Sequence, residues 1–265
     1  KEVTGSLLDE QIRTIEERLG TLRNLVKRQE EILAKIDEQG KLTPDLRKAI
    51  ENAQKLTELE DYYLPYKQKR RTRAQQAREK GLEPLATAFL LQRDQKGDAL
   101  TAARAYVDPD KGVETPEDAL AGARDIVAEL AAEDPTLRQT LREQLWNHGF
   151  LQTELVEEAE EAQTFLMYAD YQEPVRTLPS HRVLAINRGE KKGCLKVHLV
   201  WDEQQALRKM EWRVLRRPCI YRDQLKEALA DSWKRLLFPA LEREIRSRLT
   251  EQAEDQASKV FGANL

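Results

Sequence analysis

The residues with the clearest chemical potential lie between positions 59 and 73, where three tyrosines and a proline run directly into five basic side chains. Elsewhere, acidic and basic residues alternate along the sequence. Because cationic side chains neutralise phosphates and aromatic rings stack on bases, this basic-aromatic segment predicts a contact with nucleic acid. The proposed phosphate contacts are Lys67, Lys69, Arg70, Arg71 and Arg73, and the proposed stacking residue is Tyr66, with Tyr62 and Tyr63 as alternatives.

The basic-aromatic segment also has a purely structural interpretation. The tyrosine rings can pack beneath the turn that Pro65 imposes, with their hydroxyl groups at the surface. The basic side chains can then form ordinary surface ion pairs with nearby acids. Those acids are Glu58, Glu60 and Asp61.

Two smaller basic clusters are further candidates for phosphate contact. The first is predicted at the tip of a β-hairpin and consists of Arg188, Lys191 and Lys192, with His181 and Arg182 at the strand entry. Its alternative is a polar turn in which Gly189 and Gly193 supply backbone freedom. The second cluster, whose spacing also fits a solvated helix end, consists of Arg213, Arg216 and Arg217.

The sequence offers no pattern that predicts catalysis. Its histidines, His148, His181 and His198, fall on different predicted elements without a metal-ligand spacing or a nucleophile-base motif. Cys194 and Cys219 do not form a zinc knuckle, and neither a P-loop nor a dinucleotide fingerprint is present. We therefore expect no catalytic residue, no metal, no cofactor and no small-molecule substrate, so the chain is predicted not to be an enzyme.

Composition limits the surfaces that can bind nucleic acid. The 265 residues carry a formal net charge of −3, so binding must come from local patches and not from a uniformly basic surface. With 34% charged and 6% aromatic residues, the composition suits amphipathic helices with an aliphatic core. Two isolated cysteines indicate a reducing cytoplasm, and the lack of a twenty-residue apolar run excludes a membrane-spanning helix.

Hydrophobic spacing predicts a mostly α-helical fold of stacked helical hairpins, with helix-turn-helix-like units and one small β-hairpin. A long helix over 9–37 and a second one restarting at Thr43 and running past residue 56 should form the first hairpin. Shorter helices are expected from residue 72 to 146, and a long one from residue 223, which Pro239 kinks or divides. Short apolar runs at 183–186 and 195–200 predict the β-hairpin.

The predicted organisation has three regions. These are an N-terminal helical region over 1–106, a helical region over 107–221 with the small β-hairpin near 181–201, and a long C-terminal helix over 222–265.

An ordered set of short strings resembles the family of the bacterial transcription accessory protein Tex, in its N-terminal and central helical part. The strings in the first third are KEVTG at 1–5, QGKLTP at 39–44, LED at 59–61, LPYK at 64–67 and GLEPLA at 81–86. The later strings are SHR at 180–182, AINRGE at 185–190, DSWKRL at 231–236 and EDQA at 254–257. As an ordered set over almost the whole chain, they are specific.

The resemblance implies a helical scaffold within a multidomain nucleic-acid-binding protein. In that family a ribonuclease-H-like YqgF domain, helix-hairpin-helix elements and a C-terminal S1-type RNA-binding domain follow, so this chain is expected to be a piece of a longer protein that stops before them. We therefore expect non-catalytic binding of RNA or DNA. The alternative is a protein-interaction module that presents its long amphipathic helices to transcription or ribosomal machinery.

Overall fold

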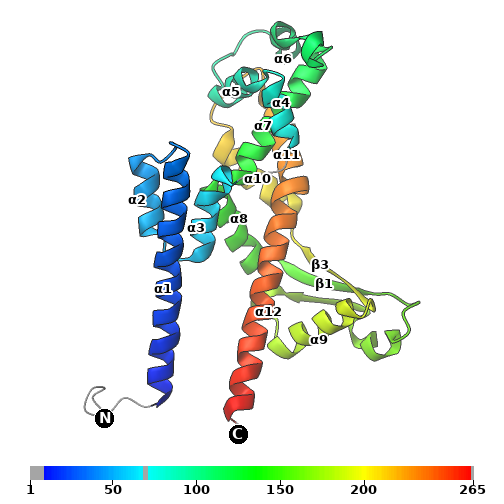
Figure 1. Cartoon of the computed structure of the whole chain (residues 1–265). Helices are drawn as coiled ribbons and strands as arrows, with labels where there is room; N and C mark the ends of the chain where they lie inside the picture. Colours follow the sequence, from blue (N-terminus) through cyan, green and yellow to red (C-terminus); the bar gives the residue numbers. More distant parts are fainter. Residues whose placement is uncertain (1–8, 68–70, 264–265) are drawn as a thin grey trace. The chain divides into compact units, whose positions relative to one another are not determined.

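The computed structural model describes residues 9–67 and 71–263, so Lys69 and Arg70 of the basic-aromatic segment lie outside the described residues. The chain divides into two compact units, residues 1–70 and 71–265. The fold is mostly α-helical with one small sheet, as predicted (Figure 1). The predicted organisation into three regions, and the helix-turn-helix character of the hairpins, stay predictions.

The first unit is a three-helix assembly. It contains α1 (Asp9–Glu38), α2 (Pro44–Asn52), α3 (Leu56–Tyr63) and a 3₁₀ turn, η1 (Leu64–Tyr66). Thr43 caps α2 as predicted, accepting a hydrogen bond from the Leu46 N–H. Its small core consists of Leu25, Ile32, Ile36, Ile50, Ala53 and Leu59.

One expected helix of this unit is instead two helices. The prediction of a single helix from Thr43 past residue 56 was wrong, because the chain leaves helical geometry between Asn52 and Leu56. The Glu58 carboxylate accepts a hydrogen bond of 2.8 Å from the Gln54 N–H, which lies outside α3. An acid in the first turn that reaches back to a preceding N–H starts a new helix, so α3 packs separately on α1.

The helices of the second unit begin largely where the sequence predicts. Thr115 and Asp118 form a reciprocal capping box at the start of the central helix, α7. Thr72, Asp98 and Asp134 each cap a helix with their side chains. The helices are α4 (Arg73–Glu79), α5 (Glu83–Leu91), α6 (Ala99–Ala103), α7 (Pro116–Glu133), α8 (Pro135–His148), α9 (Ser180–Lys191), α10 (Glu203–Val214), α11 (Arg222–Asp231) and α12 (Phe238–Ala263).

A three-stranded antiparallel sheet stands in place of the predicted β-hairpin. Its strands β1 (Phe150–Leu155), β2 (Asp170–Pro174) and β3 (Leu195–Val200) have the order β2-β1-β3. The second predicted strand is confirmed as β3, with alternating buried and exposed side chains. The first was wrong, because residues 183–186 lie in α9, where Val183 and Ile186 are buried three residues apart. A four-residue apolar run fits a helix and a strand equally well.

The end of the chain is one continuous helical rod with a local irregularity. Between α11 and α12 lies a π-helical segment, η6 (Ser232–Leu237), which ends two residues before Pro239. Proline has no N–H to donate to the carbonyl four residues earlier, and a wider π turn accommodates that loss. The Ser232 hydroxyl donates a 2.7 Å hydrogen bond to the Ala128 carbonyl, so this irregular segment is also tied to α7.

Candidate nucleic-acid interface

In the first unit, the aromatic part of the basic-aromatic segment faces its own core. Tyr62, Tyr63 and Tyr66 are half-buried and pack against the core of α1, α2 and α3. The Lys67 ammonium lies 5.4 Å from the centre of the Tyr63 ring and 2.5 Å from a carboxylate oxygen of Glu60. Tyrosine rings packed on the core and a lysine paired with a nearby acid are what the purely structural interpretation of the segment predicts.

The Glu60 carboxylate joins Lys67 to α1. It also accepts a hydrogen bond of 2.8 Å from Nε of Arg28, which lies 32 residues earlier in the chain. Burial alone would raise the pKa of Glu60, but the hydrogen bonds from Lys67 and Arg28 outweigh burial and hold that pKa below its usual value. Lys67 is therefore a partner in a charge network that fixes α3 and η1 onto α1.

In the second unit, the remaining described cations of the segment, Arg71 and Arg73, lie at the start of helix α4. Arg71 and Arg73 are exposed on either side of Thr72, whose hydroxyl accepts a hydrogen bond of 3.0 Å from the Gln75 N–H. Arg71 pairs with Glu79 at 2.6 Å, with both side chains substantially exposed. Such a pair contributes little stability and is readily exchanged for a phosphate, so both arginines stay available to a ligand.

The second predicted cluster lies at the carboxyl end of α9, and not at a hairpin tip. Arg188 and Lys191 are exposed, and in the described part of the chain neither takes part in an ion pair. Lys192 pairs with Glu161. Cations at the last turn of a helix are stabilised by its dipole, so this position accounts for the cluster without a ligand as well as with one.

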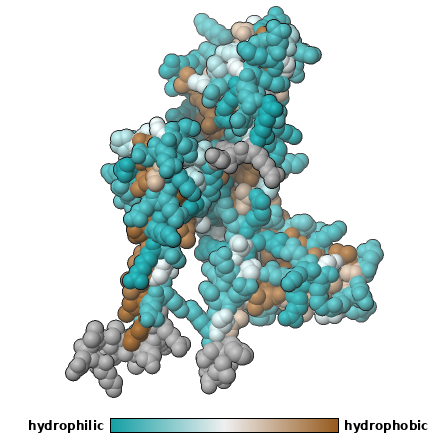
Figure 2. Space-filling view, viewed as in Figure 1, coloured by the Kyte–Doolittle hydropathy of each residue, from teal (hydrophilic) through white to brown (hydrophobic). Residues whose placement is uncertain are grey.

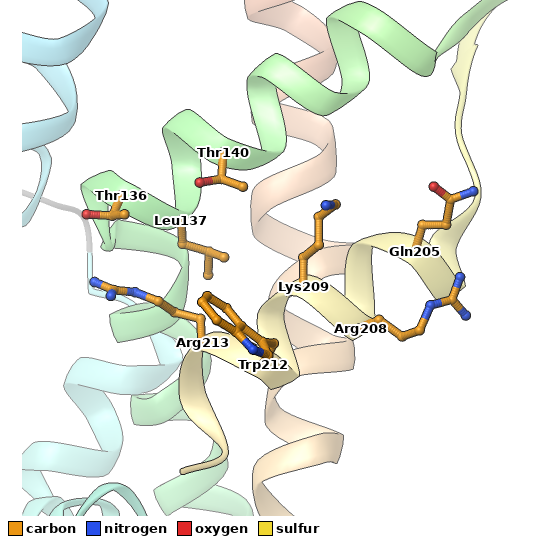
Figure 3. A pocket seen from close by; sticks show the side chains of 8 residues that line it. All are labelled: Thr136, Leu137, Thr140, Gln205, Arg208, Lys209, Trp212 and Arg213. Carbon is orange, nitrogen blue, oxygen red and sulfur yellow. The ribbon is translucent and has the colours of Figure 1, made fainter.

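A groove between α8 and α10 gathers basic residues around an exposed tryptophan, a site that the sequence reasoning missed. The Trp212 side chain is 86% exposed, the highest value among the large apolar residues of the described chain. Figure 3 shows its indole ring projecting from α10 towards Leu137 of α8, with Lys209 pointing into the same gap. The residues around this groove are Thr136, Leu137, Thr140, Gln205, Arg208, Lys209, Trp212 and Arg213.

The sequence of α10 explains how the groove is built. The Asp202 side chain caps the helix by accepting a hydrogen bond from the Gln204 N–H. Ala206 and Met210, one turn apart, are fully buried in the core of the second unit. With that face fixed, Trp212 and its basic neighbours must point outward. The groove has a volume of about 490 Å³, within the range of sites that hold small ligands.

The cations of the groove differ in how firmly they are held. The guanidinium of Arg213 lies 3.3 Å from the Asp134 carboxylate, which itself caps α8. Arg208 is 3.9 Å from Asp202, at the outer limit of an ion pair, and its side chain is largely exposed. Among the described residues Lys209 has no ion-pair partner. Arg213 therefore anchors α10 to α8, whereas Arg208 and Lys209 are free to meet an anion.

The third predicted cluster continues from this groove and is held by one buried amide. Gln92 is 2% exposed and adopts the left-handed backbone conformation, with a φ of 52°. Its Oε1 accepts hydrogen bonds from the N–H groups of Arg216 and Arg217, at 2.9 and 3.1 Å, and its Nε2 donates one of 2.7 Å to the Val214 carbonyl. Gln92 thus fixes the backbone while both arginine side chains stay exposed.

The high exposure of Trp212 could not be predicted from the sequence. Tryptophan in an amphipathic helix is usually a core residue, and Trp146, Trp201 and Trp233 of this chain are indeed half-buried or buried. The available signal was the helical position of Trp212. It lies three residues after Lys209 and next to Arg213, away from the face that Ala206 and Met210 define.

Within residues 9–67 and 71–263, no group of three or more histidine, cysteine, aspartate or glutamate side chains is arranged to hold a metal ion. In the same ranges no helix combines the length and the apolar character needed to cross a membrane.

Comparison with known proteins identifies the family. The family model described as Tex central region-like matches residues 94–261. The transcriptional accessory protein Tex of Neisseria gonorrhoeae is 42% identical, and protein YhgF of Escherichia coli is 43% identical, each over the whole chain. The human S1 RNA-binding domain-containing protein 1 is 31% identical over the whole chain. The chain spans 35% of the length of each bacterial relative and 28% of the human one. The chain thus belongs to the Tex family.

Proposed function

We propose that this chain is a non-catalytic helical scaffold that binds nucleic acid, RNA or DNA, through the groove between α8 and α10. The observation that carries the proposal is the exposure of Trp212 beside Arg208, Lys209 and Arg213. An indole ring that is not needed for the core can stack on a base of any identity. Arg208 and Lys209, four and three residues before it, can neutralise phosphates of the bound strand.

The usual free energies of stacking and phosphate contact predict that this groove binds nucleic acid with modest, salt-sensitive affinity. One base stacked on an aromatic side chain contributes about 1–3 kcal/mol, and each neutralised phosphate adds roughly one unit to the salt slope. Arg216 and Arg217 extend the basic surface beyond the groove because Gln92 holds their backbone beside the end of α10. The groove and the arginine loop together form a continuous contact for a short stretch of strand.

The cations proposed from sequence are candidates for additional contacts on a longer strand. They are Lys67, Lys69, Arg70, Arg71, Arg73, Arg188, Lys191 and Lys192, with Tyr66 as the proposed aromatic partner. The family supports the ligand class, since the human relative is named for an S1 RNA-binding domain. We propose action in the cytoplasm as part of a transcription accessory protein, without catalysis, cofactor or small-molecule substrate.

The test of the groove is a titration of fluorescently labelled RNA and DNA oligonucleotides by anisotropy at several salt concentrations. Replacing Arg208→Glu and Lys209→Glu should weaken binding at least about tenfold and flatten the salt slope by roughly two units, because two phosphate contacts are lost. The matched control is Arg47→Glu with Lys48→Glu on α2, which makes the same change of charge on exposed residues elsewhere. If both double variants lose affinity equally, the groove is not the site.

Docking to a protein of the transcription or ribosomal machinery is the alternative function. One observation favours it, the exposed apolar residues on the amino-terminal half of α1. A chain that shows no salt-sensitive binding of nucleic acid but retains a protein partner in a pull-down would support the alternative.

A further inference from the structure

The amino-terminal half of α1 exposes an apolar stripe that no described residue of its own unit covers. Ile15, Leu19, Leu22 and Val26 are 45%, 45%, 42% and 51% exposed. Figure 2 shows this stripe as a brown band along the helix. Four large aliphatic side chains in one row are more than the scattered exposure normal for a soluble surface.

The spacing of the stripe is that of a coiled coil. From Ile12 onward, the residues alternate steps of three and four, so they occupy the a and d positions of a heptad. The a positions are Ile12, Leu19, Val26 and Leu33, and the d positions are Ile15, Leu22, Gln29 and Ile36. Helices with a repeat of this kind pair along the a/d seam with another helix of the same kind.

The hairpin of α2 and α3 uses only the carboxyl-terminal half of this seam. Ile36, at a d position, is fully buried against that hairpin, as is Ile32 at the neighbouring g position, and Leu33 at the a position is half-buried against it. At the d position between the halves, the Gln29 amide donates hydrogen bonds to the carbonyls of Ile50, Glu51 and Ala53. Leu25, at a g position beside the seam, also belongs to the core of the unit, so internal packing reaches one flank of α1 as far as Leu25. The seam residues Ile15, Leu19, Leu22 and Val26 stay exposed, and we call them the open seam.

Charge determines which helix fits the open seam. Glu16 and Arg23 occupy the e positions beside it, and among the described residues neither takes part in an ion pair. In an antiparallel pair of two copies, e positions face e positions, so Glu16 of each copy meets Arg23 of the other. In a parallel pair in register, Arg18 at a g position would meet Arg23 of the other copy, which is repulsive.

We propose that the open seam of α1 binds a second copy of this chain in an antiparallel coiled coil. Leu19 then packs against Leu22 of the second copy, and Ile15 against Val26, in two-fold symmetry about the middle of the seam. The contact is isologous, since the same patch serves both copies, and it closes at two. This self-association goes beyond nucleic-acid binding and does not depend on it.

The experiment is sedimentation equilibrium of the whole chain over a concentration series, with a charge-swap cycle. The wild type should dimerise, and Glu16→Arg or Arg23→Glu alone should weaken the dimer about tenfold, equivalent to about 1.4 kcal/mol. Each single variant turns two attractive pairs into two repulsive ones. The double variant E16R/R23E should restore the wild-type constant, because the pairs are attractive again.

Recovery of the dimerisation constant in the double variant distinguishes ion pairs between two copies from effects within a single helix. Glu16 and Arg23 are seven residues apart, too far to interact on their own helix, where neighbours are three or four apart. Glu17→Arg is the matched control, since it makes the same charge change at the f position, away from the seam, and should leave the dimer unchanged. A wild type that stays monomeric throughout, or a double variant that does not recover, overturns the proposal.

Discussion

At the scale of single residues, the candidate interface depends on side chains that hydrogen-bond to the backbone as well as on those proposed to contact the ligand. Gln92 satisfies the carbonyl of Val214 at the end of α10 and two N–H groups of the segment that follows, from a position 122 to 125 residues earlier in the chain. No local sequence pattern relates residues so far apart, and the left-handed conformation of Gln92 is unusual for a residue other than glycine. The arginine cluster was visible in the sequence, whereas its support was not.

Replacing Gln92→Ala should therefore lower both stability and binding. Three polar groups lose their partner, and each unsatisfied buried group costs about 1–3 kcal/mol, so we expect the free energy of unfolding to fall by about 2 kcal/mol after partial rehydration. Chemical denaturation measures this change. The exposed Gln204→Ala is the matched control and should stay within about 0.5 kcal/mol of the wild type. Equal effects of the two substitutions would show that Gln92 does not hold the segment.

At the scale of elements, caps were predictable and short apolar runs were not. Thr43, Thr115 and Asp134 were recognisable as helix starts because capping depends on residues within one turn. The segment 183–186 was misassigned because its length fits both a helix and a strand, and packing of α9 against the sheet decides between them. The helix α10 was not predicted, although Asp202, Ala206 and Met210 carry its cap and buried face.

Gly189 shows how that packing works. The sequence suggested that this glycine supplies backbone freedom in a turn, but it lies inside α9. A β-carbon there would come within 2.6 Å of Leu195 Cδ1 and 2.8 Å of Phe165 Cδ1, both in the core. Glycine is thus required for the close approach of α9 to β3, whereas Gly193, with a φ of 71°, is the glycine that needs conformational freedom.

We expect Gly189→Ala to destabilise the second unit by about 1–3 kcal/mol, because overpacking a filled core forces side chains out of their rotamers. Thermal unfolding followed by circular dichroism measures the change. Gly20→Ala on α1 is the control, since a β-carbon there meets nothing within 4 Å and alanine favours a helix by up to about 1 kcal/mol. A Gly189→Ala variant as stable as the Gly20→Ala variant would refute the close-packing explanation.

At the scale of the whole molecule, two surfaces suggest a scaffold, one on each compact unit. The first unit carries the open seam of α1, and the second carries the groove between α8 and α10. The mostly α-helical fold and the family could be predicted from sequence because helical periodicity and ordered strings extend along the whole chain. The groove could not, since it joins two helices about 70 residues apart through tertiary packing.

The most direct test of the groove is the intrinsic fluorescence of the whole chain titrated with an unlabelled single-stranded oligonucleotide. Trp212 is far more exposed than the other tryptophans, so a stacked base should quench mainly its emission. We predict strong quenching in the wild type, its near-complete loss in Trp212→Phe, and binding weakened about tenfold or more in Trp212→Ala. Equal quenching in Trp212→Phe, or unchanged affinity in Trp212→Ala, would contradict binding of nucleic acid at this groove.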